Sequence, residues 1–137
     1  MSSIKVGIIG CGYWGKILKS KLEKISNVIF FSKIESEYIP QLKNVNWVFI
    51  ATPDQTHLDV AKKCLKLGIN VFCEKPLTLS YKESKELSII ADNNNLKLYS
   101  DDVFNYRKEA KSLINLFKTN PESINVNWEK PSRTDYG

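Results

Sequence analysis

The sequence predicts an α/β fold with a doubly wound parallel sheet. Short apolar runs rich in β-branched residues alternate with segments of helical periodicity along most of the 137 residues. The runs are nearly continuous, which is typical of parallel strands buried on both faces. Helices connect such strands by right-handed crossovers and so come to cover the two faces of the sheet.

Five buried strands are expected, at residues 4–9, 28–31, 47–51, 70–73 and 96–99. Between them, apolar residues recur at helical spacing after the glycine loop as far as Ile25, over residues 55–67, and from residue 81 to the asparagines at 93–95. Residues 110–117 have the same spacing and predict one more helix. Only a short helix is expected within residues 33–46, because Pro40 interrupts them.

Two helix ends carry specific signals. Ser80 and Glu83 form a capping box, in which each side chain satisfies a backbone amide at the start of the turn. Gly68 suits the C-terminal cap of the helix that precedes it.

Composition excludes several classes of protein. The formal net charge is +5, but the lysines are spread over several expected helices, where they indicate solvated faces rather than a nucleic-acid site. No apolar run is long enough to cross a membrane, and the N-terminus has no secretion signal, so a cytoplasmic protein is expected. Three cysteines and one histidine do not form a metal-ligand pattern, and the cysteines are expected to be small buried thiols.

The loop Gly10-Cys11-Gly12-Tyr13-Trp14-Gly15 follows the first strand and opens the first helix, as in dinucleotide-binding proteins. Gly10 permits the tight turn, Gly12 lets a pyrophosphate approach the backbone, and Gly15 lets the helix pack close to the strand. The amides at the start of the helix then face the phosphates. The loop therefore predicts a site for NAD or NADP, the alternative being a strand–helix turn that binds nothing.

The end of the second expected strand bears on the choice of cofactor. An acidic residue that binds the adenosine ribose is expected about 20 positions after the glycine loop. This chain has Ser32 and Lys33 there, and its first carboxylate is Glu35. A hydroxyl followed by a cation suits the 2′-phosphate of NADP, so NADP is favoured slightly over NAD. NAD is the alternative, and it would be favoured if the loop brought Glu35 back to the ribose.

Two further motifs follow strands, at the edge where open α/β sheets bind ligands. They are Ala51-Thr52-Pro53 with His57 four residues on, and Glu74-Lys75-Pro76. With the glycine loop and Asn105-Tyr106-Arg107, they resemble the Gfo/Idh/MocA family of oxidoreductases over about residues 4–129.

The resemblance implies a role for each motif. Lys75 would lie near the nicotinamide and the substrate hydroxyl as the catalytic residue, polarising the hydroxyl or relaying its proton. Pro76 would fix the turn after Glu74, and the family's Glu-Lys-Pro motif often has a cis peptide. Residues 51–53 would pass along the dinucleotide, with His57 near its nicotinamide end. The cofactor-binding set is therefore Gly10, Gly12, Tyr13, Trp14, Gly15, Ser32, Lys33, Ala51, Thr52, Pro53, His57, Glu74, Lys75 and Pro76.

The resemblance also implies a sugar, nucleotide sugar or polyol as substrate, and a second domain that holds a catalytic aspartate and histidine. This sequence stops about where that motif would begin, and His57 lies in a different motif. Residues 1–120 are therefore expected to form the dinucleotide-binding domain, and residues 121–137 to begin the substrate domain or to form a dimerising tail. The sequence leaves open a fragment of a larger enzyme and a short form without hydride transfer, which would be a sensor or partner module.

Residues 124–129 alternate apolar and polar side chains, with Ile124, Val126 and Trp128 on one side. Such a half-exposed strand without a sheet to join tends to pair with another chain. A homodimer through this segment is expected.

A second departure from the family is the short interval at residues 33–46, which leaves no room for a further strand and predicts an open adenine side of the site.

Overall fold

The computed structural model describes residues 3–102, together with Ser112 and Asn115. The chain divides into two units, Met1–Asp101 and Asp102–Gly137, and the fold below is that of the first. The motif at 105–107 and the alternating segment at 124–129 lie outside the described residues. The helix expected at 110–117 lies outside them as well, except at Ser112 and Asn115.

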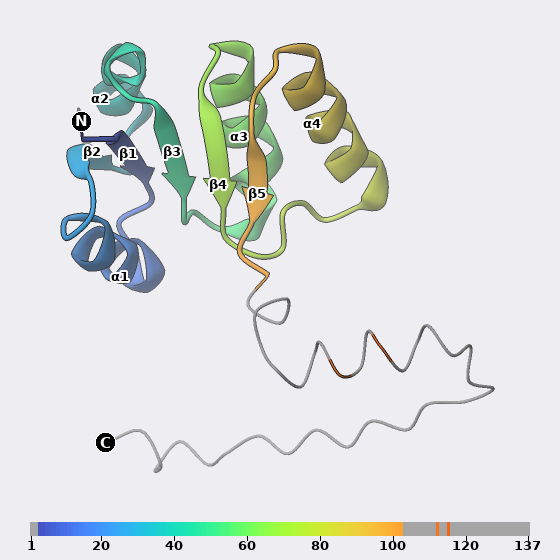
Figure 1. Ribbon diagram of the computed structural model, residues 1–137, viewed down its shortest axis with the longest axis horizontal. Coiled ribbons are helices and arrows are strands. Elements are labelled where there is room, and N and C mark those ends of the chain that lie inside the picture. The colour runs from blue at the N-terminus through green and yellow to red at the C-terminus, as the bar shows by residue number, and fades with distance from the viewer. Residues whose placement is uncertain (1–2, 103–111, 113–114, 116–137) are drawn as a thin grey trace. The chain divides into compact units, whose positions relative to one another are not determined.

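The described residues form a five-stranded parallel sheet in the order β2-β1-β3-β4-β5, which confirms the predicted fold (Figure 1). Its strands are β1 (Lys5–Ile9), β2 (Asn27–Ser32), β3 (Trp47–Ile50), β4 (Asn70–Cys73) and β5 (Leu98–Ser100). The strand order reverses between β1 and β3, because β2 lies on one side of β1 and the later strands lie on the other. Ligands of open α/β sheets bind at such a switch point.

Helices connect the strands. They are α1 (Tyr13–Leu22), the short α2 (Glu35–Tyr38) with the 3-10 helix η1 (Ile39–Asn44), η2 (Asp54–Thr56), α3 (His57–Lys66) and α4 (Tyr81–Asn93). Alternate strand residues supply two cores: Val6 and Ile8 pack with Leu22 of α1, whereas Val48 and Val71 join the larger core under α3 and α4. No helix in the described part of the chain is long and apolar enough to cross a membrane.

The helix ends follow the capping signals in two cases. The Ser80 hydroxyl accepts a hydrogen bond from the Glu83 amide at 3.3 Å, so α4 begins where the capping box predicted. Gly68 follows α3 with a φ of +79°, a backbone conformation that glycine adopts without strain.

Several expected boundaries were wrong by one to three residues, and hydrogen bonds account for two of them. The first helix ends at Leu22 instead of reaching Ile25, whose side chain is 79% exposed. The chain leaves the helix there through a tight turn, in which the Leu22 carbonyl accepts from the Ile25 amide at 3.0 Å as well as from the Ser26 amide and hydroxyl. β5 begins at Leu98 instead of residue 96, because the Leu96 amide still donates to Ala91 at the end of α4.

The interval between β2 and β3 holds α2 and η1 and no strand, as its length predicted. β2 is therefore an edge strand of the described sheet, and it pairs with β1, one of the two strands at the switch point. This short connection brings Tyr38 down against Phe30, with their ring centroids 6.3 Å apart.

Candidate functional site

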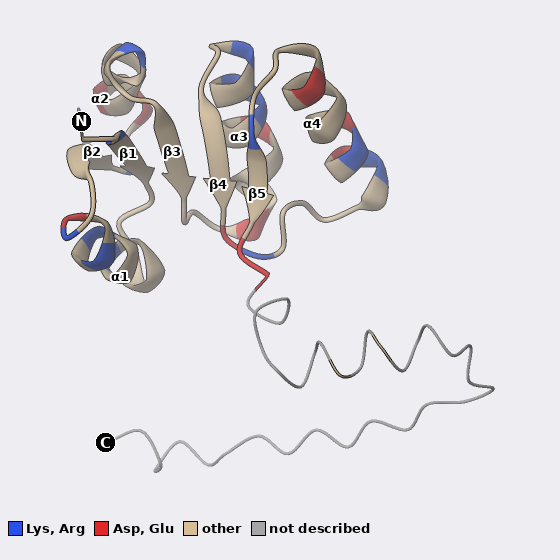
Figure 2. Ribbon diagram, viewed as in Figure 1, with Lys and Arg blue, Asp and Glu red and all other residues tan. Residues whose placement is uncertain are grey.

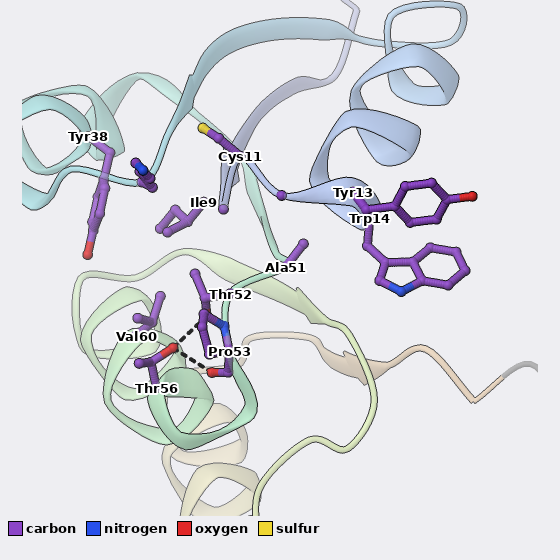
Figure 3. A pocket seen from close by; sticks show the side chains of 13 residues that line it. Ile9, Cys11, Tyr13, Trp14, Tyr38, Ala51, Thr52, Pro53, Thr56 and Val60 are labelled. Atoms are coloured by element: carbon purple, nitrogen blue, oxygen red, sulfur yellow. Dashed lines mark hydrogen bonds between the residues drawn. The ribbon is translucent and has the colours of Figure 1, made fainter.

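A cleft of about 690 Å³ opens at the carboxyl ends of β1 and β3, at the switch point of the sheet. Figure 3 shows Tyr38 and the Tyr13–Trp14 pair at opposite ends of it. It is lined by the end of β1, by the loops after β1, β2 and β3, and by residues of α1, α2, η2 and α3: Ile9, Gly10, Cys11, Gly12, Tyr13, Trp14, Lys33, Tyr38, Ala51, Thr52, Pro53, Thr56 and Val60. The structure thus brings together most of the glycine loop, Lys33 and the Ala-Thr-Pro motif, which the sequence places up to 43 positions apart.

Two glycines of the loop are required by its shape. Gly10 has a φ of +115°, and a Cβ there would lie 2.2 Å from the Ala51 carbonyl oxygen. A Cβ on Gly15 would lie 1.9 Å from the Gly10 carbonyl oxygen. Gly10 therefore lets β1 turn beside β3, and Gly15 lets α1 pack close to the turn, as the sequence predicted.

Gly12 has a different environment. A Cβ on Gly12 would meet no atom within 4 Å, so the space beside it is open. Gly12 is also the N-cap of α1, which has neither a side-chain cap nor an acidic residue in its first turn. The first amides of a helix without such partners form a binding site for an anion. A dinucleotide pyrophosphate fits this cradle, because the space beside Gly12 is open, no side chain caps the helix, and no carboxylate of the first turn repels the phosphates.

The Ala-Thr-Pro loop is held by its own side chains. The Thr56 hydroxyl contacts the Thr52 hydroxyl at 2.7 Å and donates to the Pro53 carbonyl oxygen at 2.7 Å (Figure 3). These bonds join the end of β3 to the start of α3. The wall of the cleft opposite the glycine loop is therefore a preformed turn.

His57 is fully buried and does not line the cleft. Its Nδ1 lies 2.7 Å from the Pro76 carbonyl oxygen and its Nε2 lies 2.9 Å from the Thr52 carbonyl oxygen. Both partners are acceptors, so both contacts are hydrogen bonds only when both ring nitrogens carry hydrogen. The imidazole thus joins the Ala-Thr-Pro loop to the Glu-Lys-Pro loop and positions both, and the cofactor contact that the resemblance implied for His57 stays a prediction.

The Glu-Lys-Pro loop follows β4, next to β3. Glu74 begins it with its amide bonded to the Ile50 carbonyl oxygen at 2.9 Å. Lys75 is exposed, and the peptide bond between Lys75 and Pro76 is cis, as in the family motif. Downstream, the Thr78 hydroxyl donates to the Ser80 carbonyl oxygen at 2.8 Å.

Glu74 is a buried carboxylate, only 7% exposed. Burial raises its pKa, and the negative charge of Asp101 raises it further. The Lys75 amide and the positive charges of Lys75 and His57 oppose this shift. None of the three residues Glu74, Lys75 and Pro76 lines the cleft.

The side chains at the end of β2 and just after it have different bonding partners. The buried Ser32 hydroxyl donates to Glu37 and accepts from the Ile34 amide at 3.0 Å, so it faces the α2 turn and does not line the cleft. Glu35 forms an ion pair with Lys63 of α3. Of Ser32 and Lys33, the two residues predicted to contact the cofactor here, only Lys33 lines the cleft.

The predicted site set missed five residues that line the cleft: Ile9, Cys11, Tyr38, Thr56 and Val60. Cys11 is partly exposed, so the expectation of a buried thiol was wrong for it; its place inside the glycine loop was the signal. It was right for Cys64 and Cys73, whose burial raises the pKa of each thiol to about 12. Within residues 3–102, no group of three His, Cys, Asp or Glu side chains could hold a metal ion.

Comparison with known proteins points to one family. The Gfo/Idh/MocA family model, described as an oxidoreductase family with an NAD-binding Rossmann fold, matches residues 18–101. The 2,7-anhydro-N-acetylneuraminate hydratase of Mediterraneibacter gnavus is 26% identical over 136 residues, covering 84% of this chain and 36% of that protein. The scyllo-inositol 2-dehydrogenase (NAD(+)) of Bacillus subtilis is 36% identical over 76 residues, covering 54% of this chain and 22% of that protein.

Among solved structures, the UDP-N-acetylglucosamine 3-dehydrogenase of Acidithiobacillus ferrooxidans superposes with a TM-score of 0.73 at 25% identity. The match covers 85% of this chain and 44% of that one. The chain spans about a third of the length of the curated relatives it matches.

Proposed function

The chain belongs to the Gfo/Idh/MocA family of oxidoreductases and carries their NAD-binding Rossmann fold, and from this premise we propose that it binds the dinucleotide for an enzyme acting on a sugar, nucleotide sugar or polyol. The observation that carries the proposal is the open space at Gly12 beside the uncapped start of α1. The glycine loop and the first turn of α1 would hold the pyrophosphate, and Ala51, Thr52 and Pro53 would line its other side. NAD or NADP supplies hydride acceptance or donation when bound.

Lys75 is proposed as the catalytic residue of this site. Its loop is fixed before Lys75 by the Glu74 amide, which donates to the Ile50 carbonyl, and after Lys75 by His57, which contacts the Pro76 carbonyl. An exposed ammonium group on a loop anchored in this way can donate a hydrogen bond to a substrate hydroxyl without a large rearrangement. The names of the relatives support the substrate class, since an anhydrosugar acid, an inositol and a UDP-sugar are all polyhydroxylated rings.

NADP is the proposed cofactor, with NAD as the alternative. The support comes from Lys33, whose side chain lines the cleft just after β2, where the adenosine ribose lies in sites of this kind. Ser32 gives no support, because its hydroxyl is already bonded to Glu37. Lys33→Ala is expected to weaken NADPH binding by about tenfold and to leave NADH binding unchanged, as one charge-assisted contact is lost.

The test is a fluorescence titration of the chain with NADPH and NADH, followed by an assay for turnover with polyols and UDP-sugars. Saturable binding with turnover supports the enzyme. Saturable binding with no turnover on any substrate supports the alternative, a non-catalytic sensor or partner module. Absence of binding to both dinucleotides overturns the proposal, and tighter binding of NADH overturns the preference for NADP.

The remaining proposals rest on sequence. Residues 1–120 would form the dinucleotide-binding domain, and residues 121–137 would begin a substrate domain or pair two copies of the chain through residues 124–129. A dimer by light scattering that Trp128→Asp converts to a monomer would support pairing, and a monomer in both forms would contradict it. The three free cysteines support a location in the reducing cytoplasm.

A further inference from the structure

A basic groove of about 440 Å³ lies between α3 and α4 and shares no lining residue with the cofactor cleft. Lys62 and Lys66 of α3 form one side, and Lys82 and Lys85 of α4 form the other. Figure 2 shows basic residues on both of these neighbouring helices. We call this feature the lysine groove.

The positive charge of the lysine groove is only partly neutralised. Glu86 is the one carboxylate among its lining residues, and it forms an ion pair with Lys62. In the described part of the chain, Lys66, Lys82 and Lys85 make no ion pair. The pKa of Glu86 lies below its ordinary value because Lys62 hydrogen-bonds its carboxylate, and the charges of Lys66 and Lys82 lower it further. Lys62, Lys66 and Lys82 therefore all lie close enough to Glu86 to stabilise the same carboxylate.

The floor of the lysine groove is apolar. Ile89 is 50% exposed there, and Ile90 is half-buried against the main core. Lys62 and Lys66 are four residues apart on α3, and Lys85 and Ile89 are four residues apart on α4. Such rows form the ridges of a helix surface, and the channel between two ridges accepts the side chains of another helix.

We propose that the lysine groove binds an acidic amphipathic helix of a partner protein. The apolar face of that helix would rest on Ile89 and Ile90, and carboxylates along its edges would pair with Lys66, Lys82 and Lys85. Charge complementarity at the rim of an apolar contact sets both the partner and its orientation. A nucleic acid would leave the isoleucine floor without an apolar partner, and a bilayer surface would not enter a channel between two ridges.

The proposal can be tested on the whole 137-residue chain with a fluorescein-labelled synthetic peptide of about 18 residues, with leucines on one helical face and glutamates on the others. Fluorescence anisotropy would measure its affinity for the wild type and for Lys82→Glu/Lys85→Glu. The matched control is Lys21→Glu/Lys24→Glu, which makes the same change of charge at the end of α1. A peptide of the same composition in scrambled order tests whether an apolar face is needed.

The double variant on α4 is expected to lower peptide affinity at least tenfold, because two attractions become repulsions, and the control on α1 is expected to leave it unchanged. Cofactor affinity should be equal in all three proteins, so failure here and failure of the proposed function are distinguishable. Equal loss in both double variants, equal binding of the scrambled peptide, or no binding at all would overturn the proposal. Tighter binding of duplex DNA or anionic vesicles, lost in the α4 variant, would overturn it in favour of those partners.

Discussion

Replacing Gly12 by alanine places a methyl group where the structure has no atom within 4 Å. The backbone at Gly12 is extended, with φ −73° and ψ −167°, a conformation that alanine adopts freely. The substitution should therefore leave the fold intact and even stabilise it by about 0.4–1 kcal/mol, because alanine has fewer unfolded conformations to lose.

Cofactor binding should respond in the opposite direction. A methyl group at Gly12 would occupy the approach of the pyrophosphate to the amides of α1. Loss of one hydrogen bond to a charged group costs about 1.5–3 kcal/mol, which corresponds to a loss of affinity of roughly 10- to 150-fold. Isothermal titration calorimetry with NADPH and NADH would measure the affinity, and thermal unfolding by circular dichroism would measure the stability.

Gly10→Ala provides the contrast. There the added Cβ would lie 2.2 Å from the Ala51 carbonyl oxygen on a backbone with φ +115°. We expect it to lose stability by about 1–3 kcal/mol together with binding. The reasoning would be refuted if Gly12→Ala bound the cofactor as tightly as the wild type, or if it lost as much stability as Gly10→Ala.

Three further substitutions or modifications test the rest of the site. His57→Ala should lower the free energy of unfolding in urea by about 2–4 kcal/mol, since it removes a fully buried ring and two contacts to carbonyls; a loss below about 0.5 kcal/mol would contradict its positioning role. Glu74→Gln should raise stability at neutral pH, because the raised pKa means that ionisation opposes folding; the gain should shrink as pH falls through that pKa and vanish below the ordinary value of 4.5, and a gain independent of pH would exclude this cause. N-ethylmaleimide should modify Cys11 faster than the buried Cys64 and Cys73, and saturating NADPH should protect it; peptide mass spectrometry checks both, and labelling that ignores the cofactor would place the dinucleotide elsewhere.

The strands and the glycine loop were predictable because local pattern determines them. A continuous apolar run such as residues 47–50 has few alternatives to a buried strand, and a glycine at Gly10 or Gly15 is required by contacts close to it. Ile25 shows the limit of the same reasoning. Its spacing fits the helix, yet the chain turns after Leu22, whose carbonyl accepts from the Ile25 amide, the Ser26 amide and the Ser26 hydroxyl together.

Features that depend on two distant segments could not be derived from the sequence. His57 is buried because two loops meet around it, one contacting it through Thr52 and the other through Pro76, which lies 19 residues after His57 in the chain. Ser32 donates to Glu37 only because α2 follows β2 at once, and the sequence pattern gave no sign of that partner. The lysines of α3 and α4 suggested solvated faces when taken one helix at a time, and they converge only when the two helices pack side by side.

The most direct test of the dinucleotide site is a ¹H–¹⁵N correlation spectrum of the chain, recorded with and without saturating NADPH. The site predicts the largest shifts at the amides of residues 10–15, 51–52 and 54–56, with smaller shifts at Lys33 and none along α4. Shifts of the same size spread over the surface, or none in the glycine loop, would contradict the assignment of the cleft to the cofactor.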